Sequence, residues 1–381
     1  MSVAQSEGDV PQVKAPARRN ADGTYWSQTR RRFMRSRVGV AGAVVVLVLY
    51  LICLILPEFF APYDPESKNA QYFGGPPQVV RFVDDEGQLS IQPFVYGVAR
   101  KIDPKTMQRT FAEDRSVHYP IGFFVRGDAY KLFGFIPADI HLFGSADGKG
   151  HVNLLGTDRI GRDVLSRMIH GGRLSLSMGL IGVSISLILG AVLGTVAGYF
   201  GGVTDNVVMR ATEVLMAFPT LPLWMTLAAA VPPDWSPTAV YIGITAILAL
   251  VAWGTLAREV RGKVLALREE EYVLAGRVMG ASHARLIFRH LLPGCFSHII
   301  VVATLAIPSM IIAETALGFL GLGVKPPMIS WGVMLNEAQN IRSIAHTPWL
   351  LFPAIPVIVS ILAFNFLGDG MRDAADPQSE L

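Results

Sequence analysis

The sequence is poor in charge and nearly devoid of cysteine. Charged residues make up 17% of its 381 positions and hydrophobic residues 51%, whereas an average soluble domain is roughly 25% charged. Cys53 and Cys295 are not spaced as a metal site or a redox pair. No cluster of histidine, cysteine or carboxylate has the spacing of a metal or nucleophile site either. This composition predicts an integral membrane protein with two buried free thiols, no metal and no catalytic residue.

A nucleotide-binding loop is also missing. Gly156 and Gly161 have P-loop spacing, but Arg162 and Asp163 follow where Lys and Ser or Thr are required. We therefore expect this chain to bind no cofactor and to hydrolyse no ATP, and we expect no nucleic-acid partner.

Long apolar runs predict an all-α membrane protein with six spans. The expected spans are residues 38–56, 174–200, 214–231, 238–256, 296–317 and 350–367. At 1.5 Å per residue the first is about 28 Å long, which is enough for the hydrocarbon core. A cleaved signal peptide is the alternative for this first run, but no A-x-A-like site follows it in residues 57–62. Bulky Leu51 and Ile52 argue against a lipoprotein site at Cys53.

The basic residues predict the orientation of the spans. Five arginines between positions 30 and 37 precede the first span, and residues 258–289 carry six arginines and one lysine. The connection between the fifth and sixth spans has only Lys325 and Arg342. Because cytoplasmic loops are rich in Lys and Arg, we expect residues 1–37 and 369–381 to be cytoplasmic tails, with residues 1–24 unstructured.

Residues 57–152 predict a small β-rich insert on the extracytoplasmic side. Segments 78–83 and 88–95 flank the acidic turn 84–87, a pattern typical of a β-hairpin. After the insert, residues 153–173 predict an amphipathic interfacial helix capped by Thr157 or Asp158. Arg159, Asp163 and Arg167 are expected to line its polar face.

Small residues and two carboxylates in or next to the spans are candidates for packing and function. Small residues recur every fourth position of the second span, which favours close helix packing; they are Gly182, Ser186, Gly190, Gly194 and Gly198. Glu213 and Glu314 are the carboxylates nearest to membrane depth. An ionisable group there is a functional hypothesis, and we take Glu314 as the candidate for the substrate pathway. The alternative is that each bonds to a neighbouring helix.

Residues 258–293 form a charged loop between two spans. Its local signals predict two short helices at an angle: Gly280 is a helix stop, Ser282 an N-cap, and Pro293 the end of the second helix. An ordinary basic loop is the alternative.

The spacing in this loop resembles the EAA loop of ABC importer permeases. Leu274-Ala275-Gly276, three residues, Gly280, nine residues, His290, one residue and Leu292-Pro293 follow that pattern, with Leu274, Gly276 and His290 departing from its usual residues. Segments 154–167, 314–323 and 368–374 also resemble the dipeptide, oligopeptide and nickel branch of the family. The resemblance covers roughly residues 31–377 apart from the insert.

The resemblance implies a type I ABC importer permease in a bacterial inner membrane. It implies a second homologous permease subunit, two ABC ATPase subunits that carry ATP and magnesium, an extracytoplasmic solute-binding protein and membrane lipid as partners. It further implies that the loop docks onto the ATPase; the docking residues would be Glu270, Glu271, Leu274, Ala275, Gly276, Gly280, Ala281, Ser282 and Pro293.

Two other functions stay open as alternatives. A self-sufficient secondary transporter or channel would need paired charges or broken helices at the midplane and inverted repeats. An adhesion or receptor module would use the bundle only as an anchor. The expected solutes are peptides or related small molecules, and the sequence does not choose among them.

Overall fold

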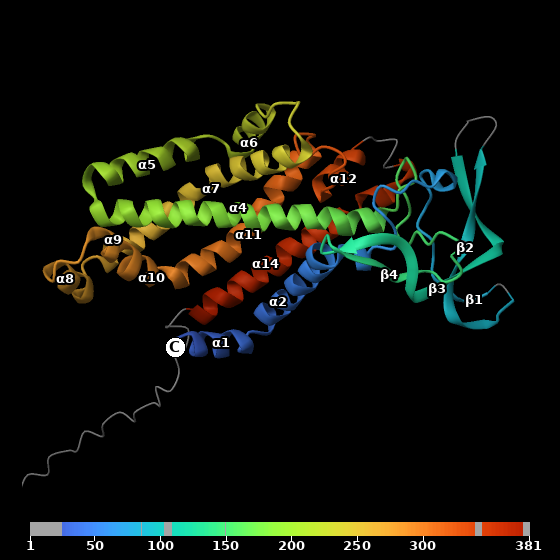
Figure 1. Ribbon diagram of the computed structural model, residues 1–381, viewed down its shortest axis with the longest axis horizontal. Coiled ribbons are helices and arrows are strands. Elements are labelled where there is room, and N and C mark those ends of the chain that lie inside the picture. Colours follow the sequence, from blue (N-terminus) through green and yellow to red (C-terminus); the bar gives the residue numbers. More distant parts are fainter. Residues whose placement is uncertain (1–24, 85, 103–108, 149, 340–344, 376–381) are drawn as a thin grey trace, which may run out of the picture.

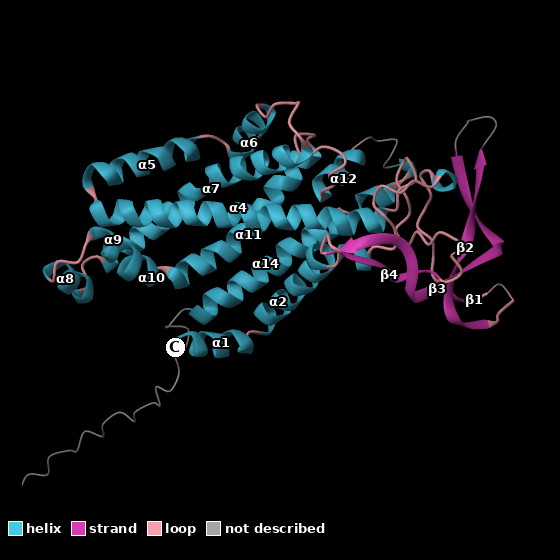
Figure 2. Cartoon of the chain, in the orientation of Figure 1, coloured by secondary structure: helices cyan, strands magenta, loops and turns pink. Residues whose placement is uncertain are grey.

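A bundle of long helices and a β-sheet at one of its ends make up the protein (Figure 1). The computed structural model describes residues 25–84, 86–102, 109–148, 150–339 and 345–375. Helices form the bundle, and the strands are confined to the sheet (Figure 2). The predicted unstructured segment 1–24 lies outside the described residues.

The N-terminal part contains more helix than predicted. Helix α1 (Tyr25–Arg35) occupies a segment that was expected to be part of a tail. The first span follows as α2 (Arg37–Tyr50) and the π-helical turn η1 (Leu51–Ile55), and the short helix α3 (Pro57–Phe60) ends it. The Ser36 hydroxyl accepts a hydrogen bond from the Gly39 amide at 3.2 Å. This N-cap separates α1 from the span.

The longest helix, α4 (Val164–Phe200), runs through the whole bundle. The predicted interfacial helix 153–173 is wrong, because its first half is a folded loop and its second half is the beginning of α4. Asp158 accepts bonds from the Ile160 and Arg162 amides, and Gly161 has a φ of 83°. These features close a turn that a helix cannot contain. Asp163, not Thr157 or Asp158, caps the helix.

The third span is broken. Helices α5 (Gly202–Ala217) and α6 (Thr220–Ala229) meet at a bend of 91°. The break falls at Phe218 and Pro219, inside the expected straight span 214–231. Because the residue before a proline is disfavoured in the α conformation, the helix ends there; Phe218 is extended, with a ψ of 140°.

The remaining spans run longer than predicted. Helix α7 (Pro237–Leu267) continues past residue 256 into the charged loop, and α14 (Ala354–Ala375) continues past residue 368 into the expected C-terminal tail. Helix α11 is Phe296–Phe319. Within the described residues, five helical segments are long and apolar enough to cross a membrane, and the α5–α6 pair makes six if it counts as one span.

Short elements connect these spans. They are η2 (Ala70–Tyr72), α8 (Glu271–Val278), α9 (His283–Arg285), the π-helical η3 (Leu286–Leu291), α10 (Leu292–Gly294), α12 (Trp331–Glu337) and η4 (Pro348–Leu351). Cys53 in η1 and Cys295 before α11 are both buried.

Helix α4 packs closely against its neighbours through its small residues. A Cβ atom at Gly190 would lie 2.8 Å from the Trp253 carbonyl oxygen, and one at Gly194 would overlap the Ala257 carbonyl. Gly198 faces α7 in the same way, Gly182 faces Met310 of α11, and Ser186 is buried between them along the helix. The absence of side chains here lets the backbones of α4 and α7 approach.

Four antiparallel strands form one sheet in the order β1-β2-β3-β4: β1 (Arg81–Val83), β2 (Leu89–Ile102), β3 (Arg109–Leu132) and β4 (Ile136–Ser145). The acidic turn joins β1 to β2, and the Asp84 carboxylate accepts the amides of Glu86 and Gln88 at 3.0 and 2.8 Å. Val95, Ile121 and Val152 make a small core beneath the sheet.

Candidate functional site

The elbow, residues 271–294 (α8 to α10), lies at the end of the bundle farthest from the sheet (Figure 1). The elbow has two arms, α8 and the continuous segment of α9, η3 and α10. Gly280 follows the first arm in the left-handed conformation, with a φ of 77°. The Ser282 hydroxyl then accepts the Arg285 amide at 3.3 Å and begins the second arm. Pro293 does not end this arm, because α10 leads through Cys295 directly into α11.

One face of the elbow is buried against itself and the bundle. Val273, Leu286 and Leu291 are fully covered and join a core that includes Val264 of α7. Gly276 is buried as well, and a Cβ there would lie 3.0 Å from the Leu286 side chain. The two arms therefore hold a fixed angle, because α8 packs directly on η3.

Polar contacts fasten the elbow to the end of α4. The Tyr199 hydroxyl lies 2.7 Å from His283 Nδ1, and the Arg277 guanidinium lies over the Tyr199 ring at 5.7 Å from its centroid. Beside them, Arg268 Nη1 donates to the Gly198 carbonyl at 3.1 Å. A displacement of the elbow would therefore reach α4 directly.

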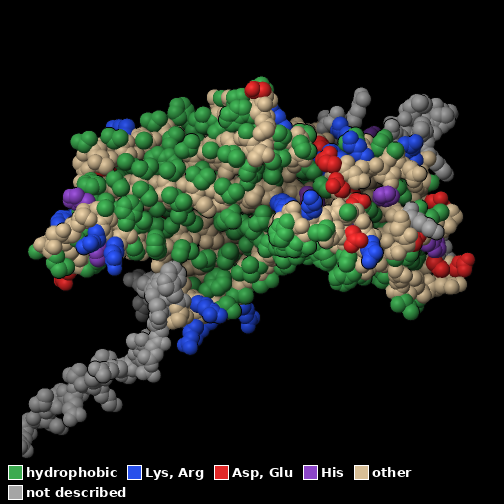
Figure 3. Space-filling view, in the orientation of Figure 1, with side chains coloured by type: hydrophobic (Ala, Val, Ile, Leu, Met, Phe, Trp, Pro, Cys, Tyr) green, Lys and Arg blue, Asp and Glu red, His purple; other side chains and the backbone are tan. Residues whose placement is uncertain are grey.

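The other face of the elbow is exposed and apolar. Val278 and Met279 are 88% and 81% exposed, although they are large aliphatic side chains. Their surroundings are basic, and Figure 3 shows Lys and Arg side chains gathered at this end of the molecule. Exposed apolar groups with charged neighbours are typical of protein interaction sites.

The predicted docking residues all lie in or next to the elbow, at several depths. Gly276 is buried, Ala281 is half-buried, and the exposed ones are Glu270, Glu271, Leu274, Ala275, Gly280, Ser282 and Pro293. Val278, Met279, Tyr199 and His283 were missed. Two successive large apolar residues inside a charged segment were the available signal for the first two.

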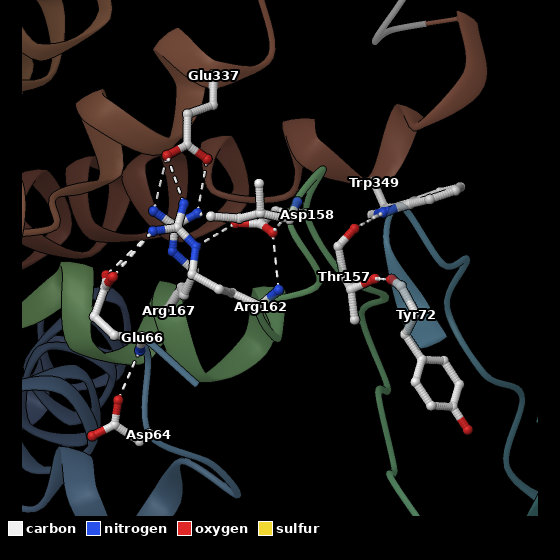
Figure 4. Close-up of polar contacts among 10 residues, drawn as sticks. Asp64, Glu66, Tyr72, Thr157, Asp158, Arg162, Arg167, Glu337 and Trp349 are labelled. Atoms are coloured by element: carbon white, nitrogen blue, oxygen red, sulfur yellow. Dashed lines mark hydrogen bonds and ion pairs between the residues drawn. The ribbon is translucent and has the colours of Figure 1, made fainter. Parts of the chain in front are cut away.

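A buried cluster of ion pairs occupies the opposite end of the bundle (Figure 4). Arg167 Nη1 donates to Asp158 Oδ2 at 2.7 Å and to Glu337 Oε2 at 2.7 Å. Arg162 Nε donates to the same Asp158 oxygen at 2.6 Å, and its Nη1 reaches Glu66 at 3.3 Å. The side chains of Asp158 and Arg167 are each 3% exposed. The cluster joins α4, the loop before it, α12 and the start of the insert.

The same loop is held from its other side by Thr157. Its hydroxyl bonds to the Tyr72 carbonyl, and its own carbonyl accepts the Trp349 indole N–H at 2.8 Å. Next to it, burial raises the pKa of the Asp163 carboxyl to about 7, against two hydrogen bonds from Ser166 that lower it. The cluster was not predicted, because Arg167 was expected on the polar face of a helix that Thr157 or Asp158 would cap.

The two carboxylates near membrane depth have different surroundings. Glu314 of α11 is buried, and its Oε2 accepts a hydrogen bond from Ser175 of α4 at 2.7 Å. This agrees with the alternative in which it bonds to a neighbouring helix. Glu213 is exposed and pairs with Arg210 of its own helix at 2.9 Å. Among the described residues, no group of three metal-ligating side chains is placed to hold a metal ion.

Known proteins match most of the chain outside the sheet. The family described as "Binding-protein-dependent transport system inner membrane component" matches residues 190–380, and "N-terminal TM domain of oligopeptide transport permease C" matches residues 24–77. A glutathione transport system permease of Pectobacterium atrosepticum is 40% identical over 233 residues, which is 61% of this chain and 75% of the relative.

Two further relatives carry peptide names. A dipeptide transport system permease of Alkalihalophilus pseudofirmus is 41% identical over 224 residues, and an oligopeptide transport system permease of Bacillus subtilis is 38% identical over 224 residues. Each match covers 58% of this chain and 71% of the relative.

The long apolar helices define a multi-pass membrane protein. The chain belongs to the family of binding-protein-dependent transport system inner membrane components, in its ABC peptide permease branch. The resemblance found in the sequence is therefore confirmed.

Proposed function

We propose that this chain forms one half of the translocation pathway of an ABC importer for peptides or related small solutes. The observation that carries the proposal is the elbow, which exposes Val278 and Met279 on a rigid two-armed support that is bonded to the end of α4. A second permease subunit would complete the pathway. Two ATPase subunits would supply ATP and magnesium, and a binding protein would deliver the solute.

The elbow's construction supports a mechanical role. When ATP closes an ATPase dimer, the docked elbow moves with it. The contact of His283 with Tyr199 passes this movement to α4, and the packing of the elbow against Val264 passes it to α7. Because α4 and α7 pack backbone to backbone along their small residues, they move together. Access then changes at the far end of the bundle.

Charge supports an orientation with the elbow in the cytoplasm. The basic residues of α1, of the end of α7 and of the elbow lie at one end of the bundle, and the sheet lies at the other (Figure 3). The positive-inside rule then places both termini in the cytoplasm and the sheet outside.

The docking role is tested by charge on the exposed face of the elbow. We expect Val278→Glu and Met279→Glu each to lower ATP-dependent uptake at least tenfold in vesicles, because a carboxylate would be buried without a partner at an apolar contact. Membrane insertion and thermal stability should not change, since both side chains are exposed in this subunit. Val203→Glu, at an exposed position in the first turn of α5 at the same end, is the matched control. Normal uptake in both elbow variants would refute the docking claim.

The outer part of the sheet is proposed to contact the binding protein. Phe82, Leu89 and Ile91 expose apolar side chains on β1 and β2, and Ile91 is fully exposed. We expect Phe82→Ser with Ile91→Ser to weaken the stimulation of ATPase activity by the binding protein several-fold. Point variants suit this test better than deletion of 66–152, because Gln78 and Asn153 bond to each other across its boundary.

A self-sufficient secondary transporter is the alternative function. Purification of the tagged chain from its host, with mass spectrometry of what co-purifies, separates the two. Recovery of a second permease and ATPases supports the importer. Solute movement by the chain alone, reconstituted without ATPases, would establish the alternative.

A further inference from the structure

The hairpin of β3 and β4 carries a second group of exposed apolar side chains, separate from those on β1 and β2. Phe133 and Phe135 lie at its tip and are 51% and 73% exposed. Phe123, Phe124, Ile136 and Ile140 are exposed along its strands. Exposed apolar side chains gathered on one hairpin indicate a contact with an apolar partner.

The tip itself is a tight three-residue connection, since Leu132 pairs with Ile136 across the hairpin. Phe135 N–H donates to the Leu132 carbonyl at 3.3 Å, and the residues between them have positive φ, 54° at Phe133 and 83° at Gly134. Such a turn favours Asn or Asp followed by Gly. Phenylalanine is strained there, so the turn geometry does not account for its presence.

The middle of the hairpin is fixed to the end of the first span. His141 Nδ1 lies 2.6 Å from the Ala61 carbonyl oxygen, and the rings of Phe124 and Phe59 are 6.2 Å apart. The Asp128 carboxylate accepts the Asp64 amide at 3.1 Å. Because α3 follows directly after the span, the hairpin is anchored at the membrane boundary.

From this anchor the hairpin turns back toward the bundle. In Figure 1 the tip between β3 and β4 points away from the rest of the sheet and ends beside the end of α2 in that view. The tip begins at Phe135, six residues from His141, which corresponds to about 20 Å of strand. Apolar surface extends from the bundle onto the near part of the sheet on the face that Figure 3 shows.

We propose that the tip of the β3–β4 hairpin inserts Phe133 and Phe135 into the lipid leaflet on the sheet side of the bilayer. The hydrocarbon-facing surface of the first span, which exposes Leu51 and Ile55, is continued by the hairpin. Lys131 next to the tip is exposed and lies where lipid phosphates would be. The hairpin thereby fixes the sheet over the mouth of the bundle, so that the β1–β2 face points away from the membrane.

The choice of lipid over a protein partner rests on position and chemistry. The tip presents phenylalanine rings with no hydrogen-bonding group, and it is anchored beside a lipid-facing helix. The β1–β2 patch has similar exposure but lies at the far side of the sheet from the bundle (Figure 1). It therefore serves as the matched control.

A fluorescent probe on a single surface cysteine tests the proposal. Phe135→Cys and, as control, Ile91→Cys are made in the full chain, produced with its co-purifying subunits and placed in phosphatidylethanolamine and phosphatidylglycerol nanodiscs. Cys53 and Cys295 are buried, so unsubstituted protein gives the background labelling. Quenching is measured with nitroxide-labelled lipid and with aqueous iodide.

We expect lipid nitroxide to quench the probe at position 135 several-fold more than the probe at 91, and iodide to give the reverse order. Equal iodide quenching at both positions would overturn the proposal. A probe at 135 shielded from both quenchers would also overturn it, because a protein partner would then cover the tip. Phe133→Cys repeats the test at the neighbouring tip position and decides the result if the first variant does not fold.

Discussion

The two ends of the bundle use charged residues in opposite ways. At the elbow end, arginines surround an apolar face that stays exposed, and only a few contacts reach α4. At the sheet end, Arg162 and Arg167 turn inward and share Asp158 and Glu337 in a buried cluster. In sequence both regions are short motifs rich in charge. Such a motif can therefore mark either a surface for a partner or a buried ion-pair cluster that holds the fold together.

The difference follows from what each motif is attached to. The elbow lies between the ends of α7 and α11, and Val278 and Met279 on its outer face stay exposed. The loop before α4 is covered by Tyr72, Trp349 and α12, so its charges need partners inside the fold, and they find them on α4, α12 and the insert.

Disruption of the buried ion-pair cluster should have the largest effect on stability. We expect Arg167→Ala to lower the free energy of unfolding by about 3 to 5 kcal/mol, because Asp158 and Glu337 lose a buried partner. Thermal unfolding in detergent micelles measures this loss. Arg173→Ala is the control at the same end: its ion pair with Glu58 is more exposed, so its removal should cost less than about 1 kcal/mol. Equal losses would show that the buried cluster stabilises the fold no more than an exposed ion pair does.

The close packing of α4, the helix that joins the two ends, against α7 is the second contact to test. We expect Gly194→Ala to destabilise the protein by about 2 to 3 kcal/mol, because the new methyl group overlaps the Ala257 backbone. Gly262→Ala in α7 is the matched control, since a Cβ there meets nothing within 4 Å. That change should be neutral or slightly stabilising. If both variants behave alike, close contact between α4 and α7 is not what holds the bundle.

The beginning of the same helix should respond to pH. Burial raises the pKa of Asp163 to about 7, against about 3.9 in an unfolded chain. Between these values the folded state keeps a proton that the unfolded state releases, so the contribution of Asp163 to stability is largest at low pH and falls as pH rises toward 7. We expect a loss of about 2 kcal/mol between pH 5 and 7. Asp163→Asn should flatten this slope, and a wild-type protein with no slope would contradict the prediction.

The sequence predicted the positions of the spans better than their ends. The apolar runs located the spans, because a helix that crosses the lipid needs a long run of apolar side chains. Their ends were predicted poorly: α7 and α14 continue into charged segments, since a helix leaving the membrane can project into water. The break at Phe218 and Pro219 was missed because proline also occurs within spanning helices.

The candidate site was predicted unevenly for a similar reason. The turn at Gly280 and the cap at Ser282 were found because they depend on neighbouring residues alone. The contacts of His283 with Tyr199 and of Arg167 with Glu337 join positions 84 and 170 residues apart. One sequence without its relatives holds no signal for such pairs.

The smallest effect on stability is expected from removing a helix cap in the elbow. This change distinguishes the elbow from the rest of the bundle, because it should affect transport more than unfolding. We expect Ser282→Ala to cost about 1 kcal/mol locally, because the Arg285 amide loses its cap. The elbow should loosen and ATP-dependent uptake should fall severalfold, while global unfolding barely changes. Ser236→Ala removes a cap of the same kind, 3.2 Å from the Ala239 amide at the beginning of α7, and should leave uptake unchanged. If both variants reduced uptake equally, transport would depend on helix caps in general and not on the angle of the elbow.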